Sequence, residues 1–267
     1  MNVASAMVAG AELTLRRPVS SLRSYLGCFW SIETTSATRL RTLPDGCAAI
    51  SVEVPEGASP KCLFVGPCLT PTERVPGGRQ ILFGVRLRPG VAFALTSVPV
   101  YKLADRRVRL AAMLPEDARR LEKRLADRQT PDERFDALEQ FLVPRIVGAQ
   151  IDPRVQSALK RIEDCGGQMR IAELARECRV SPRHLNRLMR NWVGVSPKRL
   201  ARFVRFQTLL QRMEASPHNS ARVAAELGYF DQAHLSNEVA QFAGTSPGLV
   251  AAHRVADFSK TRCEMIW

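Results

Sequence analysis

The part of the chain best suited to binding a polyanion is a basic segment between residues 170 and 212. It holds eleven Lys or Arg side chains and two acidic ones. Within it, four polar side chains recur at three- and four-residue spacing, which places them on one face of a helix: Arg183, Asn186, Arg187 and Arg190. Arginine matches the O6 and N7 of guanine, asparagine matches the N6 and N7 of adenine, and further cations meet phosphates. The segment therefore predicts a helix that reads the major groove of double-stranded DNA.

The same segment carries an apolar stripe that would anchor this helix in a core. Its members follow helical periodicity between residues 182 and 193: Leu185, Leu188, Met189 and Trp192. Pro182 suits the first turn, where its missing N–H would have no intrahelical partner. A basic run is often just a solvated face, so its spacing alone leaves that alternative open.

An internal repeat decides between these alternatives. Residues 171–197 align with residues 221–247 at an offset of 50, and the aligned identities pair Ala175 with Ala225, His184 with His234, Leu185 with Leu235, Gly194 with Gly244, Ser196 with Ser246 and Pro197 with Pro247. In each copy a short helix is followed by a turn residue (Val180, Phe230), a capping residue (Ser181, Asp231) and a second helix that ends at glycine. This pattern predicts two helix-turn-helix units.

A single helix is expected to join the two units. It begins at Ser196-Pro197 and runs to about Glu214, before Ser216-Pro217-His218-Asn219 breaks it. At 1.5 Å per residue it is about 28 Å long. That length is comparable with the ~34 Å between successive major grooves on one side of B-DNA. One chain could therefore seat two recognition helices in neighbouring grooves.

The N-terminal part has a different pattern, with strand-length runs separated by Pro, Gly and Asp turns. The runs from residues 12 to 110 are Tyr25–Ile32, Cys47–Val54, Lys61–Val65 and Gln80–Leu87. They predict a small barrel or sandwich. From Pro115 the pattern becomes helical, with an apolar stripe formed by Leu121, Leu125, Phe135, Leu138, Leu142 and Ile146. These helices either pack on their own β-domain or form a dimerisation element.

The sequence thus predicts an α+β chain, a β-rich domain followed by an all-α domain. We expect a β-rich domain at residues 1–112, amphipathic helices and a linker at 113–149, a DNA-binding domain at 150–254 and a tail at 255–267. The helical domain should begin with Asp152 as N-cap and Pro153 in the first turn.

Composition narrows the function classes. The formal net charge of +13 favours a polyanionic partner. No stretch approaches a membrane span and the first ten residues lack the features of a secretory signal, so we expect a cytoplasmic protein with no membrane partner. All four histidines lie in the last third of the chain, and the acids of the β-domain show no paired spacing. We expect no enzymatic activity, no metal and no cofactor; Asp45 is interpreted as a turn residue.

Two ligand-related alternatives remain for the β-domain. Four of the seven cysteines fall there (Cys28, Cys47, Cys62 and Cys68). They indicate either small buried side chains or a thiol-reactive or alkyl-acceptor sensor coupled to DNA binding. Aromatic residues either form the core or line a pocket for a small-molecule effector: Phe29, Trp30, Phe64, Phe83 and Phe93. Arg86 and Arg88 face either an anionic ligand or solvent.

Residues 154–254 resemble the DNA-binding domain of AraC/XylS-type transcription regulators. The resemblance rests on the segments 171–175 (IAELA), 181–185 (SPRHL), 194–197 (GVSP), 223–229 (VAAELGY), 230–235 (FDQAHL) and 244–247 (GTSP). Residues 17–110 resemble the small sensor-type domain of a subgroup of these regulators through segments 43–46 (LPDG), 64–67 (FVGP) and 84–90 (GVRLRPG).

The resemblance implies a sequence-specific regulator, often an activator, that acts with RNA polymerase and whose N-terminal domain senses a signal or forms a homodimer. The base-reading positions that it implies are Arg183, Asn186, Arg187 and Arg190 in the first unit, and Gln232, His234, Ser236 and Asn237 in the second. This chain departs from the family pattern at Asn237, where a basic residue is usual, and at Glu238, where an apolar or neutral one is usual. No Lys or Arg lies between Phe230 and Leu249. We therefore expect the first unit to supply most of the affinity and specificity.

Overall fold

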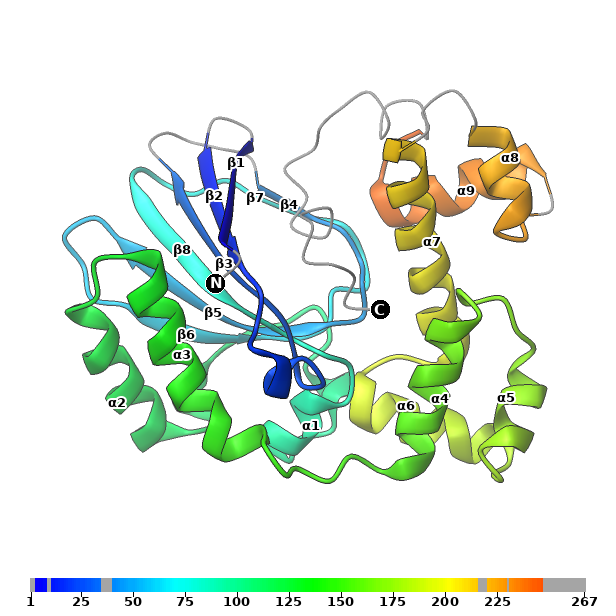
Figure 1. Cartoon of the computed structure of the whole chain (residues 1–267), viewed down its shortest axis with the longest axis horizontal. Helices are drawn as coiled ribbons and strands as arrows, with labels where there is room; N and C mark the ends of the chain where they lie inside the picture. Colours follow the sequence, from blue (N-terminus) through cyan, green and yellow to red (C-terminus); the bar gives the residue numbers. More distant parts are fainter. Residues whose placement is uncertain (1–2, 9–10, 35–39, 216–219, 230, 247–267) are drawn as a thin grey trace.

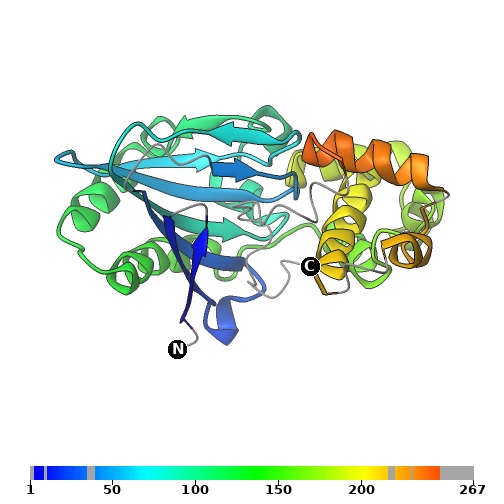
Figure 2. The same ribbon diagram turned by 90° about the horizontal axis from the view of Figure 1, so that it is seen from above.

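The computed structural model describes residues 3–8, 11–34, 40–215, 220–229 and 231–246. A β-sheet backed by two helices occupies one side of the molecule, and a cluster of helices occupies the other (Figures 1 and 2). The expected α+β class, with a β-rich N-terminal part and an all-helical C-terminal part, is confirmed.

The main sheet is antiparallel and seven-stranded, in the order β1-β2-β3-β8-β5-β6-β9. Its strands are β1 (Val3–Val8), β2 (Ala11–Arg16), β3 (Leu26–Thr34), β5 (Ala48–Pro55), β6 (Lys61–Val65), β8 (Gln80–Leu87) and β9 (Arg107–Arg109). A two-stranded sheet pairs β4 (Leu40–Thr42) with β7 (Thr72–Arg74). The four predicted strand runs correspond to β3, β5, β6 and β8 within two residues at each end.

Strand β8 lies at the centre of the sheet, where it pairs with β3 on one side and with β5 on the other. Val85 lies opposite Phe29 of β3 and Ile50 of β5. Phe29, Phe83 and Val85 are fully buried. The buried apolar residues of these three paired strands therefore form part of the hydrophobic core.

Helices α2 (Pro115–Ala126) and α3 (Pro131–Ile146) cover one face of this sheet (Figure 1). Their six predicted apolar stripe residues are all buried. Thr130 and Glu133 form a capping box that begins α3. Of the two interpretations of these helices, the structure shows the apolar stripe packed on the chain's own sheet, so a dimer contact would have to use other faces of the helices.

A short helix, α1 (Val91–Thr96), and three 3₁₀ turns complete the N-terminal part: Ser20–Leu22, Val100–Lys102 and Leu110–Ala112. The helical part consists of α4 (Pro153–Asp164), α5 (Ile171–Glu177), α6 (Pro182–Val193), α7 (Pro197–Ala215), α8 (Ser220–Glu226) and α9 (Gln232–Ala243). As predicted, α4 begins at Pro153, and the Asp152 side chain accepts from the Arg154 N–H. Among the described helices, none is both long and apolar enough to cross a membrane.

Candidate nucleic-acid interface

The first helix-turn-helix unit consists of α5 and α6, joined by a tight turn. Arg179 adopts a left-handed conformation in this turn, and the Val180 N–H donates to the Ala175 carbonyl at 3.0 Å. Ser181 caps α6, because its hydroxyl accepts from the His184 N–H at 3.2 Å. At the other end, α6 stops at Gly194, which is also left-handed. The predicted bounds and caps of this helix are confirmed.

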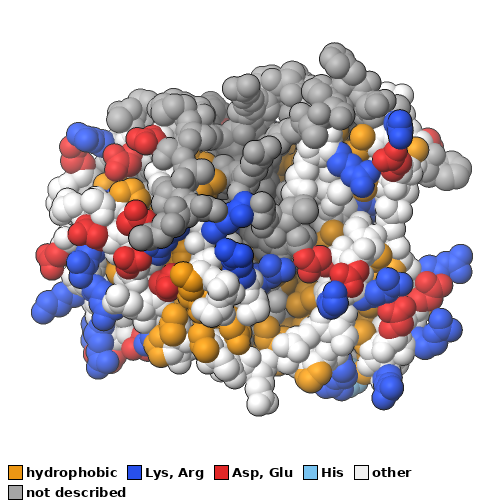
Figure 3. All heavy atoms as spheres, viewed as in Figure 1, with side chains coloured by type: hydrophobic (Ala, Val, Ile, Leu, Met, Phe, Trp, Pro, Cys, Tyr) orange, Lys and Arg blue, Asp and Glu red, His pale blue; other side chains and the backbone are white. Residues whose placement is uncertain are grey.

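Helix α6 is divided cleanly into two faces. Leu185 and Met189 are fully buried, while Leu188 and Trp192 are half-buried and pack against the same core. The four predicted base-reading residues of this unit are exposed: Arg183, Asn186, Arg187 and Arg190. Basic side chains line the lower edge of the helical part, where α5 and α6 lie (Figure 3). The structure thus brings the first-unit residues together on one solvent-facing surface.

The C-terminal end of α6 rests against the N-terminal part of the molecule. The Arg190 guanidinium carbon lies 5.2 Å from the centroid of the Tyr101 ring, a cation–π arrangement. Trp192 packs on Phe93 of α1, with ring centroids 4.5 Å apart. Arg190 is therefore oriented by the β-rich part of the chain, a contact that no local sequence signal could have revealed.

Helix α7 runs through the helical part and ends near the second unit (Figure 1). It has 19 residues and is about 28 Å long. Its apolar residues include Leu200, Phe203 and Leu210, all buried. The predicted connecting helix is confirmed.

The second unit repeats the first with one difference in the turn. The Tyr229 N–H donates to the Ala224 carbonyl at 3.1 Å, as the Val180 N–H donates to that of Ala175. Ala224 is buried, whereas Ala225 is exposed. The predicted pairing of Ala175 with Ala225 is therefore wrong. Ala175 corresponds to Ala224, so the first helices of the two units, α5 and α8, align at an offset of 49.

The second helices keep the predicted offset of 50. Asp231 caps α9 by accepting from the His234 N–H at 2.6 Å, as Ser181 caps α6. The turn of the second unit is thus one residue longer, with Tyr229 at the position of Val180. Phe230, which the repeat places at that position, and Pro247 lie outside the described residues, as does the tail at 255–267.

The exposed face of α9 has few groups that could read DNA. At an offset of 50, the positions of the four α6 readers are taken by Ala233, Ser236, Asn237 and Ala240. Asn237 and Gln232 are exposed, while Ser236 and His234 are half-buried. His234 lies 5.3 Å from the Tyr229 ring, centroid to centroid. The predicted second-unit residues all lie on α9, and none of them is a Lys or Arg.

Glu238, the departure from the family pattern, is a structural residue. It is 2% exposed. Its carboxylate accepts from the Arg202 Nε at 2.7 Å and from the Tyr229 hydroxyl at 2.9 Å. The Arg205 Nε lies 3.4 Å away. The carboxylate thus joins α9 to α7; burial raises the pKa of the Tyr229 hydroxyl, and the charge of Glu238 raises it further.

A groove of about 790 Å³ lies between the two units, lined by α7, the start of α5 and the start of α9. Four of its lining residues are cations: Arg170, Lys198, Arg202 and Arg205. Arg170 and Lys198 are exposed. These cations belong to the basic segment, but no local signal in the sequence predicts that they line one groove, because that depends on the packing of α5, α7 and α9.

In the β-rich part, Asp45, Arg86, Arg88 and the aromatic residues make structural contacts. Asp45 accepts from the Cys47 N–H at 2.8 Å and pairs with Arg86, both being buried. Arg88 lies 3.5 Å from Glu163 of α4. Phe29, Phe64 and Phe83 belong to the core, and Phe93 packs on Trp192. Trp30, with Cys47 and Arg86, lines a cavity of about 130 Å³.

The cysteines of the β-rich part are shielded. Cys28, Cys47, Cys62 and Cys68 are all buried. Burial raises the pKa of Cys47 to about 12, and burial together with the charge of Glu122 raises that of Cys62 to about 12. A thiol with such a pKa stays protonated and unreactive at neutral pH. No group of three or more metal-ligating side chains occurs within the described ranges.

Comparisons with known proteins agree with this division of the chain. Residues 174–252 match a family model described as a helix-turn-helix domain, and residues 15–109 match one described as a domain of unknown function (DUF6597). No curated protein matches. Solved structures similar to the chain include ToxT from Vibrio cholerae in its P21 form, at 10% identity over 84% of this chain and 97% of that one, with a TM-score of 0.42. ToxT from Vibrio cholerae O395 is similar at 10% identity over 83% and 95%, also with a TM-score of 0.42. The chain thus carries an AraC-type helix-turn-helix domain in its C-terminal part and a DUF6597 domain in its N-terminal part.

Proposed function

We propose that this protein is a sequence-specific transcription regulator that inserts α6 into the major groove of its operator. The observation that carries the proposal is the exposed face of α6, with three arginines and one asparagine opposite a buried apolar stripe. The exposed guanidinium groups and amide have the donor and acceptor geometry that base edges require. The cap at Ser181 leaves the start of this helix free to enter the groove.

The second unit would occupy the neighbouring major groove on the same side of the duplex. Helix α7 spans about 28 Å, close to the ~34 Å between successive grooves. The DNA backbone between the two grooves would then face the groove between the units, where Arg170 and Lys198 are exposed. Phosphate contacts there would set the register without reading sequence.

The two units should contribute unequally. Among the described residues that we expect to face DNA, the Lys and Arg side chains lie on α6 or line the groove between the units. Helix α9 presents Gln232, His234, Ser236 and Asn237 instead. Neutral side chains gain little from counterion release, which dominates affinity for DNA. We therefore expect α6 to supply most of the affinity and specificity, and α9 to contribute a weaker preference.

The first experiment is selection of bound DNA from a random library, with the full-length protein and with residues 150–267. It should return an asymmetric site in which one major groove is strongly specified and the next weakly. Arg187→Ala should then weaken binding to the selected site by about 1–3 kcal/mol and relax specificity at one base pair. Asn237→Ala should cost less than about 0.5 kcal/mol, because the α9 contacts are few.

Arg161→Ala is the matched control for Arg187→Ala. Arg161 lies on α4, not on α6, and pairs with Glu177 at 3.0 Å. It should leave base preference unchanged. Equal losses for Arg187→Ala and Asn237→Ala would contradict the asymmetry. Failure of the full-length protein to prefer the selected site over scrambled DNA at physiological salt would contradict the proposed function.

The proposal also covers the compartment, the effect on transcription and the role of the DUF6597 domain. A regulator of this type would act in the cytoplasm as an activator through RNA polymerase, with the DUF6597 domain sensing a small molecule or forming a homodimer. A reporter placed downstream of the selected site should show increased expression in cells that produce the protein. Half-sites that appear in pairs with the full-length protein, and singly with residues 150–267, would support the homodimer.

A further inference from the structure

Arg134, on α3, is the starting point because it is a buried cation with an unused donor. It is 5% exposed. Its Nε donates to the Arg128 carbonyl at 3.2 Å, and its guanidinium carbon lies 5.6 Å from the centroid of the Phe83 ring. Within the described part of the chain, its Nη1 has no hydrogen-bond partner. A buried charged donor without a partner is costly, so it points to a group that the protein binds.

The other buried arginines of the described chain are paired with carboxylates. Arg16 lies within 3.6 Å of Asp132, Asp136 and Glu139. Arg86 pairs with Asp45. The chain thus pairs buried arginines elsewhere but leaves Arg134 without a carboxylate at ion-pair distance in the described residues.

The acids nearest Arg134 do not replace this missing partner. The Glu133 carboxylate accepts from the N–H groups of Gln129 and Thr130 at 3.0 and 3.1 Å in the capping box of α3. Glu33, at the end of β3, is exposed. Burial lowers the pKa of the Arg134 guanidinium, whereas Glu33 and Glu133 raise it. Arginine nevertheless remains protonated at neutral pH, so the side chain is a fixed positive charge.

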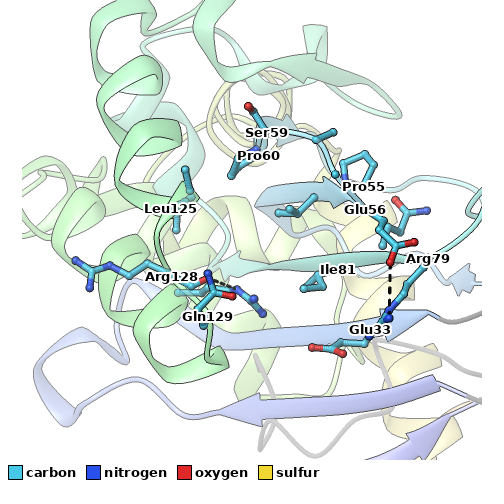
Figure 4. A pocket seen from close by; sticks show the side chains of 16 residues that line it. Glu33, Pro55, Glu56, Ser59, Pro60, Arg79, Ile81, Leu125, Arg128 and Gln129 are labelled. Carbon is cyan, nitrogen blue, oxygen red and sulfur yellow. Dashed lines mark hydrogen bonds and ion pairs between the residues drawn. The ribbon is translucent and has the colours of Figure 1, made fainter.

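Arg134 lines a cavity of about 530 Å³ between the end of the sheet and the α2–α3 turn. This volume lies in the range of sites for small ligands. Figure 4 shows the side chains that surround the cavity, which come from the β5–β6 turn, the starts and ends of neighbouring strands, and α2 with its following loop: Ser59, Pro60, Ile81, Leu125, Arg128 and Gln129. Apolar and polar side chains thus share the lining.

We propose that this cavity binds a small molecule with an apolar body and a carboxylate or another oxyanion, which pairs with the Arg134 guanidinium. Leu125, Ile81 and Pro60 would contact the apolar body. Gln129 also lines the cavity, and its side-chain amide would donate to the ligand. An ammonium group on the same molecule would find Glu33 at the cavity. The ligand is thus an organic anion or a zwitterion such as an amino acid.

The site stands apart from the DNA-binding surface. Helices α2 and α3 lie at the opposite end of the molecule from α8 and α9 (Figure 1). Binding can therefore be measured on the full-length protein without DNA, and its outcome does not depend on the proposed regulatory function.

A matched series of probes tests the chemistry: 4-methylpentanoate as the anion, leucine as the zwitterion, 4-methylpentanamide as the neutral analogue and inorganic phosphate as the anion without an apolar body. Ligand-observed NMR and calorimetry at millimolar concentration would measure binding. We expect 4-methylpentanoate or leucine to bind more tightly than the amide by roughly tenfold or more, because one hydrogen bond to a charged group is at stake. Tighter binding of leucine would assign the zwitterion and a role for Glu33; tighter binding of phosphate would assign a phosphorylated ligand.

Two variants and a control link binding to this cavity. Arg134→Gln should reduce affinity roughly tenfold to hundredfold. Ala58→Trp, at an exposed position of the β5–β6 turn that lines the cavity, should block it while leaving Arg134 in place. Arg120→Gln removes the same charge from the exposed face of α2, outside the cavity, and should bind like the unmodified protein. Thermal unfolding of each variant shows whether the protein is folded. If Arg134→Gln is not folded, ligand binding to the Ala58→Trp protein tests the proposal.

The proposal is overturned by any of three results. These are equal binding of the amide and the acid, unchanged binding of the acid or phosphate in a folded Arg134→Gln or Ala58→Trp protein, and no binding of any anionic probe at millimolar concentration. Loss of DNA recognition in the Arg187→Ala protein, by contrast, would leave ligand binding at Arg134 unaffected. The two proposals can therefore fail separately.

Discussion

At the scale of single residues, the buried carboxylate of Glu238 in the second unit determines the role of the arginines beside it. Arg202 and Arg205 belong to the most basic segment of the chain, yet both contact Glu238. Arg202 also donates to the Gln241 side chain at 2.6 Å. Part of the positive charge that the sequence offers to DNA is thus used to join α7 to α9. A basic residue in a DNA-binding domain is not always a phosphate ligand.

Glu238→Gln should destabilise the protein by about 2–3 kcal/mol. The substitution removes the charge that compensates two arginines and leaves the Tyr229 hydroxyl with a weaker acceptor in a buried site. The free energy of unfolding in denaturant would measure the loss. DNA binding should weaken in parallel, because α9 would no longer be held at a fixed angle to α7.

Glu226→Gln is the matched control for this variant. Glu226 also contacts two arginines, Arg212 at 2.8 Å and Arg222 at 2.9 Å, but its side chain is 44% exposed. Solvent screens these pairs, so the expected loss is within about 0.5 kcal/mol. A similar loss from both substitutions would show that burial of Glu238 contributes little.

At the scale of elements, the ends of α6 connect the reading surface to the rest of the molecule. Its start is capped by Ser181 and solvent-facing, while its end at Gly194 is buried against Pro67 and Val100. A shift of the β-rich part would therefore act on the C-terminal end of the reading helix, where Arg190 contacts Tyr101.

Gly194→Ala should be more destabilising than Gly148→Ala. Both glycines have positive φ, at 92° and 79°, so both substitutions cost about 1 kcal/mol in backbone strain. A Cβ at Gly194 would lie 3.1 Å from both Pro67 Cγ and Val100 Cγ1, whereas one at Gly148 would meet nothing within 4 Å. The difference, about a further 1 kcal/mol or more in the free energy of unfolding, reports the domain contact. Equal losses would mean that α6 is not packed against the β-rich part in solution.

At the scale of the whole molecule, the two parts share one continuous core. The cluster of buried apolar residues runs from Phe29 and Phe83 in the sheet through α1 to Phe203 and Phe242 in the helical part. Polar contacts join the same surfaces. Gln207 Nε2 donates to the Pro44 carbonyl at 2.9 Å in a buried position, and Arg199 donates to the Leu69 carbonyl at 2.8 Å. We therefore expect the full chain to unfold in one cooperative transition.

Gln207→Met should lower the free energy of unfolding by about 1–3 kcal/mol. The substitution keeps the volume but leaves the buried Pro44 carbonyl without its donor. Gln211→Met, one turn further along α7 at a half-buried position, should change stability by less than about 0.5 kcal/mol. Thermal and denaturant unfolding would distinguish them. Two separate transitions, or no difference between the variants, would show that the two parts are only loosely associated.

The sequence alone determined the features that depend on neighbours along the chain. The helices at 182–193 and from 197 onward, their caps at Ser181 and Asp231, and the exposed face of Arg183, Asn186, Arg187 and Arg190 follow from periodicity and capping chemistry, which act over one or two turns. The strands β5, β6 and β8 were predictable for the same reason, since runs rich in β-branched or aromatic residues and the turn residues that bound them are local signals.

Tertiary structure decided what depends on residues far apart in the sequence. The turn of the second unit has one extra residue, which puts Ala224 rather than Ala225 in the core. No local sequence pattern signals this residue, and the backbone hydrogen bonds of the two turns reveal it. The same holds for the buried position of Glu238, for the stacking of Arg190 on Tyr101 and for the unpaired Arg134 at a cavity. Each is a matter of which groups meet after folding, because desolvation and pairing depend on the surroundings in space rather than on sequence spacing.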